Sequence, residues 1–222
     1  MTQPLAAISR IEAARLEAGP IAEMDLMRSY CALRLPFPGN LLLAAIAALL
    51  SACASAPKLT YDLNPVRGAF GPRAADRQLA IAIPDATLPE NSSEIVVRTS
   101  PESVAYLSGA QWADRLPILI QSRLIESFQN AHVLRGAGGP GILADATLQT
   151  NLRRFEYDAG ASLAAVEISA QLTGTSGRVI AARRFTANVP VPSSEPPAVA
   201  AALDAGLSKI MREIVLWAAP KV

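Results

Sequence analysis

An unbroken apolar run near the N-terminus decides which part of this chain enters a folded domain. Residues 41–53 read LLLAAIAALLSAC, and the fully apolar part, Leu41 to Leu50, is 10 residues long. A membrane-spanning helix needs roughly 20 apolar residues, whereas this length suits the hydrophobic region of a secretory signal. Arg28 and Arg34 precede the run and supply the positive charge that such signals carry. We therefore expect residues 1–52 to be a signal peptide that takes no part in the fold.

The end of the run resembles the lipobox of bacterial lipoproteins, with Leu50, Ser51 and Ala52 preceding Cys53. In that motif the cysteine thiol receives a diacylglyceryl group and the preceding peptide bond is cut. The resemblance implies lipidation at Cys53 and an anchor of several acyl chains, which binds a membrane stably. Ala54, rather than an aspartate, follows the cysteine. By resemblance to sorting in enteric bacteria, that favours the periplasmic face of the outer membrane. A chance cysteine after a signal peptide, or a short buried helix, is the alternative.

The first 26 residues do not fit a signal peptide, because they carry four acidic side chains, Glu12, Glu17, Glu23 and Asp25. A start at Met27 would give a short basic leader and a signal of ordinary length. We predict that Met27 is the true start, with Met24 as the alternative, and that residues 1–26 are an artefact of start assignment.

The chain that would remain after cleavage begins at Cys53 and holds 170 residues, enough for one domain with its own core. Its 16 Lys and Arg nearly balance its 15 Asp and Glu, so nucleic-acid binding has little support. Cys53 would be consumed by lipid, which leaves no thiol for a disulfide or a metal site. We expect residues 53–60 to be a lipidated tether and residues 61–219 to form a single domain.

Two amphipathic helices are predicted. From about residue 110 to 130, apolar residues recur every four positions, with Pro117 either in the first turn or at a kink: Trp112, Leu116, Ile120, Leu124 and Phe128. The second helix follows Ser194, a candidate cap, with Pro196 and Pro197 in its first turn. Its apolar stripe comprises Val199, Leu203, Leu207, Ile210, Ile214 and Trp217. Both tryptophans are expected in the core.

The remaining apolar segments predict strands. Short strands are expected at Tyr61–Leu63, 78–83, 95–97, 104–107 and 133–135, with a flexible glycine-rich loop at 136–141. From 144 to 189, alternation predicts an antiparallel meander with a turn at 173–177. The alternation slips by one near Arg153-Arg154, which predicts a bulge there. The expected class is α+β, a largely antiparallel mixed sheet with two long helices packed on one face.

No set of residues predicts catalysis. His132 is the only histidine, no G-x-S-x-G motif accompanies it, and a metal site of conventional ligands is not expected. The loop GAGGPG at 136–141 lacks the Lys-Ser/Thr that follows a phosphate-binding loop. Glu156 and Asp158 would share one face of a strand, where we expect both to be solvated rather than to act as an acid and base pair. We predict no enzyme activity and no cofactor.

Four arginines are the strongest candidates for contacts with another molecule. Arg153, Arg154, Arg183 and Arg184 all fall in the predicted meander. As a positive patch they would contact lipid headgroups or an acidic partner. The alternative is that they form salt bridges with Glu156, Asp158 and Glu167.

The order of these segments is similar to the ABC-type transport auxiliary lipoprotein family, which includes the paraquat-inducible protein C type. Residues 81–131 carry the resemblance, with a strand ending at Pro84, then IVVR at 95–98, Tyr106, and WAD at 112–114 opening a helix. Tyr61-Asp62-Leu63 after the lipid cysteine matches the start of the family, and the IVLW at 214–217 matches its end. The long glycine-rich loop after Arg135 departs from the pattern.

The resemblance implies a non-enzymatic auxiliary component of an MCE-type lipid transport system, docked at the outer membrane. The implied partners are an MCE-domain protein and an ABC permease and ATPase complex, with self-association left open. A structural lipoprotein that activates another cell-envelope machine is the alternative.

Overall fold

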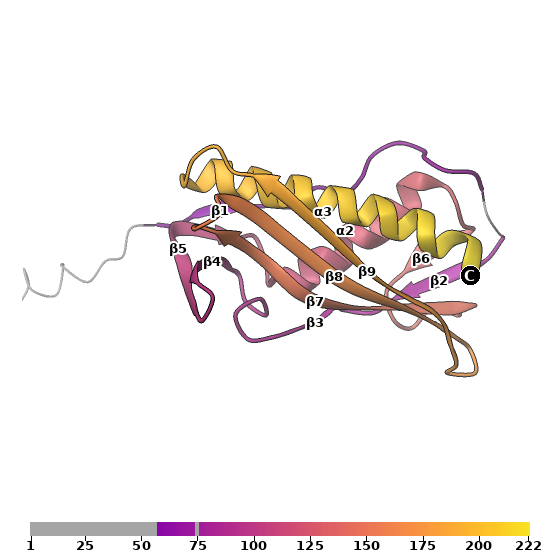
Figure 1. Ribbon diagram of the computed structural model, residues 1–222. Coiled ribbons are helices and arrows are strands. Elements are labelled where there is room, and N and C mark those ends of the chain that lie inside the picture. Colours follow the sequence, from indigo (N-terminus) through magenta and orange to yellow (C-terminus); the bar gives the residue numbers. More distant parts are fainter. Residues whose placement is uncertain (1–56, 74–75) are drawn as a thin grey trace, which may run out of the picture. The chain divides into compact units, whose positions relative to one another are not determined.

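The computed structural model describes residues 57–73 and 76–222, which form one mixed sheet with two long helices packed against it (Figure 1). Nine strands of these residues belong to the sheet. They are β1 (Leu59–Tyr61), β2 (Gln78–Ile81), β3 (Asp85–Ala86), β4 (Glu94–Ser100), β5 (Ser103–Trp112), β6 (Gly136–Gly138), β7 (Ala146–Asp158), β8 (Leu163–Gly174) and β9 (Val179–Pro190). The predicted α+β class is confirmed.

The long strand β7 is the axis of the sheet. It pairs antiparallel with β8 along its whole length, from Asp158↔Leu163 to Ala146↔Gly174, and β9 continues this meander beyond β8. On its other edge β7 pairs in parallel with three short strands in succession, β2, β3 and β4. The predicted meander is confirmed. Its alternation, however, does not indicate the parallel pairs, because they join segments far apart in the chain.

Helix α2 (Leu116–Ala131) buries four residues of the predicted stripe, Leu116, Ile120, Leu124 and Phe128. Pro117 lies in its first turn, where the missing N–H costs no helical hydrogen bond, so the first of the two alternatives for Pro117 is confirmed. Trp112 was expected in this helix, and that prediction is wrong. It ends β5, and its buried ring packs edge-on against Phe155 with a centroid distance of 5.7 Å. A buried strand residue therefore falls in phase with the helical stripe by coincidence.

Helix α3 (Pro196–Ala218), continued by the 3-10 turn η1 (Ala219–Lys221), carries the second predicted stripe. Pro196 and Pro197 occupy its first turn as expected, but the residue before the helix is Glu195, without a side-chain cap. The prediction of Ser194 as cap is therefore wrong, because the helix begins one residue later. Trp217, near the end of α3, is partly buried and packs edge-on against Phe185 of β9 at 5.6 Å.

The segment between α2 and β7 differs from the prediction. Val133 to Arg135 is not a strand, and the strand is instead β6, within the glycine-rich segment expected to be a flexible loop. His132 ends α2 with a left-handed backbone (φ 54°), after which Val133 and Leu134 are buried in the core. β6 forms because it pairs in parallel with β2, from Gln78↔Gly136 to Ala80↔Gly138. This long-range pairing outweighs the low strand propensity of glycine.

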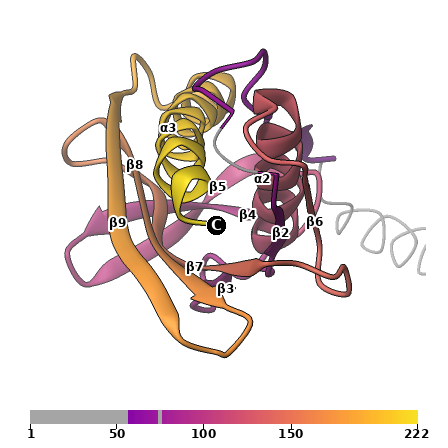
Figure 2. The same ribbon diagram turned by 90° about the vertical axis from the view of Figure 1, so that its right-hand side faces the viewer.

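Both helices lie on the same side of the sheet, which curves around them (Figure 2). The apolar residues of the sheet's inner face and of the two helices form one buried cluster. Burial of this apolar area is the main force that holds the layers together. None of the helices in the described part of the chain is both long and apolar enough to cross a membrane. The opposite, outer face of the sheet carries the polar residues considered next.

Candidate functional site

A bulge in β7 brings two arginines opposite one position of β8. Leu152 pairs with Ile168, but the next residue in register with Glu167 is Arg154, so Arg153 is the extra residue. The bulge predicted near Arg153-Arg154 is thus confirmed. In a regular strand, neighbouring side chains point to opposite faces, but a bulge relaxes this rule. Both arginines reach carboxylates on the polar side of the sheet.

Glu167 of β8 collects an arginine from each neighbouring strand. Its Oε1 lies 3.3 Å from Nε of Arg153 on β7 and 3.4 Å from Nε of Arg184 on β9. Both arginine side chains are about half exposed or more, at 51% and 63%. Pairs this exposed each contribute about 1 kcal/mol or less to stability. The three residues thus form a solvated ionic row across three strands.

Glu156, by contrast, is fully buried. Its Oε1 accepts hydrogen bonds from Nε of Arg98 on β4 and from Nε of Arg154, each at 2.8 Å. Its Oε2 has no hydrogen-bond partner among the described residues. The expectation that Glu156 is solvated is wrong, because β4 pairs with β7 and lays Arg98 beside the carboxylate. The hydrogen bond to Glu156 is the main cause that raises the pKa of Arg98 above its ordinary value, against the opposing effect of desolvation.

The four predicted arginines do not lie together as one group. Arg183 reaches toward α3, where its Nη2 is 3.8 Å from Oε2 of Glu213 and its guanidinium lies 4.9 Å from the centre of the Phe185 ring. Salt bridges from Arg153, Arg154 and Arg184 to Glu156, Asp158 and Glu167 are present, as the salt-bridge alternative expects. Contact of the four arginines with headgroups or an acidic partner stays a prediction.

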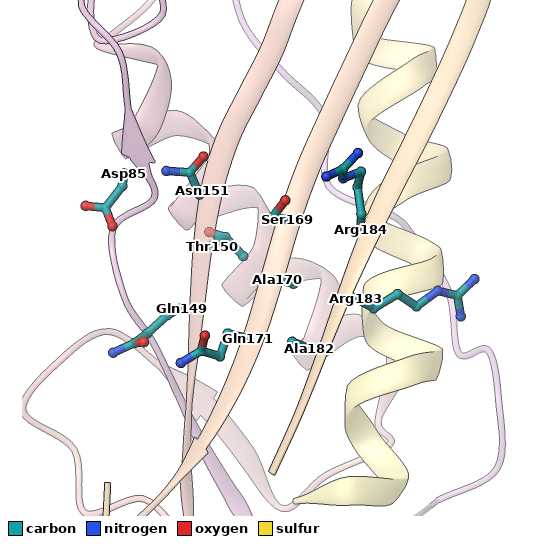
Figure 3. A pocket seen from close by; sticks show the side chains of 10 residues that line it. All are labelled: Asp85, Gln149, Thr150, Asn151, Ser169, Ala170, Gln171, Ala182, Arg183 and Arg184. Atoms are coloured by element: carbon teal, nitrogen blue, oxygen red, sulfur yellow. The ribbon is translucent and has the colours of Figure 1, made fainter. Parts of the chain in front are cut away.

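A shallow depression of about 430 Å³ lies beside these arginines (Figure 3). One row of its lining crosses four strands in register, with Asp85 opposite Asn151, Asn151 opposite Ser169, and Ser169 opposite Arg184. Figure 3 shows Arg183 pointing away from the other labelled side chains. Amides, a hydroxyl, a carboxylate and a guanidinium form hydrogen bonds readily, but they make no nucleophile and base pair.

Other candidates for chemistry lie away from this face or outside the described residues. His132 sits at the end of α2. No cluster of three or more potential metal ligands occurs within residues 57–73 and 76–222. Cys53 and the lipobox residues Leu50, Ser51 and Ala52 precede the described residues, which begin at Pro57.

Sequence reasoning missed Arg98 as a site residue. It is the last residue of the IVVR segment, and its position alone gives no sign of its partner, because Glu156 lies 58 residues further along the chain. The sequence does contain one signal of this site, because two acidic residues, Glu156 and Asp158, lie close to a predicted bulge. Bulges often re-aim side chains, so buried pairing there was a reasonable alternative to solvation.

A family model described as "ABC-type transport auxiliary lipoprotein component" matches residues 61–215. The protein bll6063 of Bradyrhizobium diazoefficiens is 30% identical over 184 residues, covering 79% of this chain. The match covers 49% of that protein, so this chain spans about half the length of its curated relative.

Two solved structures resemble the fold. The crystal structure of protein XCC0632 from Xanthomonas campestris, of the DUF330 family, aligns with a TM-score of 0.66 and 29% identity, covering 72% of this chain and 95% of that one. A crystal structure titled only as an uncharacterized protein aligns with a TM-score of 0.61, covering 72% of this chain and 97% of that one. Its identity of 14% supports the fold alone.

Proposed function

Because the chain belongs to the family of ABC-type transport auxiliary lipoprotein components, we propose that it docks a lipid transporter at a membrane. In this proposal Cys53 carries the lipid anchor, and the domain stands on the periplasmic face of the bacterial outer membrane. The transporter is an MCE-type system, in which an MCE-domain protein works with an ABC permease and ATPase. The chain acts as a non-enzymatic adaptor.

The observation that carries the proposal is the family match over residues 61–215, which takes in α2, most of α3 and nearly the whole sheet. The lipobox supports the anchor, since Leu50 ends an apolar run and the small residues Ser51 and Ala52 follow it directly before Cys53. Each buried methylene of an acyl chain contributes about 0.8 kcal/mol, and a second chain makes attachment stable. Ala54 after the cysteine supports export to the outer membrane.

The chemistry of the outer face supports docking rather than catalysis. Its charged side chains are mostly paired within the chain, as Arg153 and Arg184 are with Glu167. The depression beside them is shallow and lined mainly by amides, hydroxyls and charged groups, among them Asp85 and Arg184. A surface of this kind suits hydrogen bonding to a protein partner, because polar and solvated groups are typical of interfaces that form and separate.

Co-purification from native membranes tests the proposal. The full chain, with an affinity tag at its C-terminus, is extracted in mild detergent after chemical cross-linking. Recovery of an MCE-domain protein together with an ABC ATPase would support the adaptor. Recovery of cell-wall synthases instead would favour the alternative, a lipoprotein that activates another envelope machine.

Cys53→Ser is the matched variant for the anchor. It keeps the leader and the domain but removes the sulfur that would be alkylated. We expect the variant to fold and, once its leader has been removed, to be found apart from membranes, whereas the native chain floats with them. Intact-mass measurement of the native chain is the second readout, because a diacylglyceryl group adds a defined mass. A native chain that carries a free thiol at Cys53 would overturn the anchoring part of the proposal.

A further inference from the structure

We propose that the β4–β5 hairpin rests on the bilayer that holds the lipid anchor, so that the domain stands on the membrane in one fixed orientation. The hairpin comprises residues 94–112, with its turn at Pro101 and Glu102. This inference rests on the proposed lipidation of Cys53. It adds a second contact, which would be made by the folded domain itself.

The point at which the chain enters the fold is firmly held. β1 pairs in parallel with the end of β5, from Leu59↔Ala110 to Tyr61↔Trp112. Just before it, Lys58 forms an ion pair with Glu94 of β4. Just after it, both carboxylate oxygens of Asp62 accept hydrogen bonds from Nη2 of Arg123 on α2, at 2.9 and 2.8 Å. The start of β1 therefore does not swing freely on the domain.

The tether sets how far this entry point can lie from the membrane. Cys53 precedes Leu59 by six residues. An extended chain covers at most 3.3–3.6 Å per residue, so six residues span at most about 20 Å. Leu59 of a lipidated chain must stay within that distance of the lipid.

The distance by which the hairpin turn extends beyond the start of β1 is similar to the reach of the tether. Because β1 runs parallel to the last residues of β5, the N-terminal end of β1 faces along β5 toward the hairpin turn. In Figure 1 the β4–β5 hairpin projects from the sheet, and β1 lies by the end of β5 that is away from the turn. From Ala110 back to Ser103 is seven residues, which on a strand is about 23 Å. The reach of the tether thus matches the projection of the hairpin, and a short tether brings the hairpin turn to the level of the bilayer.

Two exposed side chains on β5 suit a membrane surface, and the turn before them also exposes the acidic Glu102. Tyr106 is 52% exposed and Val104 is 40% exposed, and both stand on β5 next to residues of β4 on the outer face of the sheet. Leu59 of β1, at the entry point, is 59% exposed. Tyrosine is enriched at the boundary between membrane and water, because its ring is apolar and its hydroxyl remains hydrated.

The hairpin is also held rigidly enough to position the domain. Arg98 donates from Nη1 to the carbonyl oxygen of Pro101 at 3.0 Å, and from Nε to the buried Glu156. The hydroxyl of Thr99 donates to the carbonyl oxygen of Ser103 at 3.3 Å. The turn is therefore joined through Arg98 to the centre of the sheet, and a contact at the turn fixes the whole domain.

The orientation that follows places the β8–β9 turn far from the bilayer. Arg98 pairs with Asp158 at one end of β7, and Ala146 pairs with Gly174 at the other end. The twelve steps between these ends of β7 span about 40 Å. Val179, just after the β8–β9 turn, is 48% exposed and comes from this distant end. It provides a matched control for Val104, since both are exposed valines on hairpins.

Single-thiol labelling of the lipidated protein tests the inference. Val104→Cys and Val179→Cys are made separately in the full chain, and the lipidated proteins are purified from membranes. Cys31 is lost with the leader and the sulfur of Cys53 is blocked by lipid, so each variant offers one reactive thiol. Each is labelled with the fluorophore NBD and reconstituted into phosphatidylcholine and phosphatidylglycerol vesicles. Thermal unfolding of both labelled variants checks that they fold as the native chain does.

The inference expects a several-fold rise in NBD emission at residue 104 on reconstitution, with quenching by headgroup-labelled spin lipids, and neither effect at residue 179. Flotation with the vesicles measures separately whether the lipid anchor holds the protein on the membrane. If the variants float but the two probes respond alike, the hairpin contact is wrong while the anchor stands. If residue 104 responds only after the MCE partner is added, the hairpin binds protein and the bilayer contact is also wrong. If the native protein does not float with the vesicles, it carries no lipid anchor, and this inference is wrong together with the anchor.

Discussion

Arg98 of β4 and Glu156 of β7 lie 58 residues apart in the chain and join these two strands through a hydrogen bond of 2.8 Å between Nε and Oε1. The carboxylate is fully buried, and the arginine side chain is 28% exposed. Arg154 donates to the same oxygen. The pair therefore ties the β4–β5 hairpin to the central strand β7 at a point where the carboxylate has no contact with water.

Arg98→Ala should destabilise the domain by roughly 2–4 kcal/mol, because it leaves a buried carboxylate with one arginine in place of two. The free energy of unfolding in urea, followed by circular dichroism, measures the loss. Arg153→Ala is the matched control, since Arg153 is half exposed and pairs with the half-buried Glu167. Its expected cost is about 1 kcal/mol or less. Equal losses for the two variants would contradict a special role for the buried pair.

Replacing both members of the pair should recover much of this loss. In Arg98→Met combined with Glu156→Leu, the buried charge disappears together with its partner, and apolar side chains of similar length occupy the space. Such exchanges are often neutral for stability. A double variant that is less stable than Arg98→Ala would show that Glu156 matters through a contact other than Arg98.

The contact between Asp62 and Arg123 predicts a dependence of stability on pH. The hydrogen bond from Arg123 lowers the pKa of Asp62, although burial opposes it. A carboxyl whose pKa is lower in the folded state adds stability above its unfolded pKa of about 3.9, and this is lost as the pH falls through the folded value. The stability advantage of the native chain over Asp62→Asn should therefore be present at pH 7 and shrink below about pH 4. Because Asp62 is 57% exposed, the difference should stay below about 1 kcal/mol.

Urea unfolding of both proteins at pH 7 and at successive acid values measures this effect. Asp204→Asn serves as a comparison, because Asp204 also accepts hydrogen bonds from the entry segment, at Asn64, but pairs with no arginine of the described residues. A constant difference between Asp62→Asn and the native chain across this range would mean that the ion pair does not contribute to folding.

The parts of the fold that sequence predicts are those governed by neighbours along the chain. The stripe from Leu116 to Phe128 and the stripe from Val199 to Ile214 follow from helical spacing, and both are buried as expected. The bulge at Arg153 follows from a one-residue slip in the alternation of β7. Each of these signals is contained in a short window, so it does not depend on which other segment lies beside it.

The parts that sequence does not predict depend on pairing between distant segments. Glycines 136 and 138 form a strand only because β2 lies beside them. Glu156 is buried only because β4 and its Arg98 lie beside β7. For the same reason, the sequence identifies the arginines of the candidate site but does not predict where each one lies. Arg183 pairs with Glu213 of α3, whereas the others lie on the outer face.

Gly206→Ala should destabilise the domain although alanine favours helices. Gly206 lies in α3, and an added Cβ would stand 3.0 Å from Cγ2 of Val166 on β8 and 3.6 Å from Cγ2 of Val189 on β9. The gain in helix propensity is about 1 kcal/mol. Overpacking against a buried β-branched residue costs typically 1–3 kcal/mol, so we expect a net loss of about 1 kcal/mol. Thermal and urea unfolding measure it.

Val166→Ala provides the test of this cause. It removes the methyl group that the new Cβ would approach most closely, Cγ2 of Val166, so the loss caused by Gly206→Ala should shrink or change sign in the Val166→Ala background. A double-mutant cycle gives the coupling between the two sites. Additive effects would show that the close approach of α3 to β8 at Gly206 is not what resists the alanine.

Deletion of Arg153 should leave the domain folded. Arg153 is the extra residue of the bulge, and without it Leu152 and Arg154 become neighbours that keep their partners Ile168 and Glu167. The alternation of β7 is then regular, with no side chain moved to the wrong face. The lost ion pair to Glu167 is exposed, so we expect a change in stability of about 1 kcal/mol or less.

Deletion of Asn151, two residues earlier, is the matched control for this prediction. It shortens β7 by the same length but on the regular side of the bulge. Asn151 is not an extra residue of the strand, so its deletion shifts its neighbours by one position. The buried Leu152 would move to the polar face and Arg153 would take its place in the core. We expect this variant to lose several kcal/mol or to fail to fold, because it buries an unpaired charge. If the two deletions unfold at the same urea concentration, the bulge does not mark the position of the extra residue.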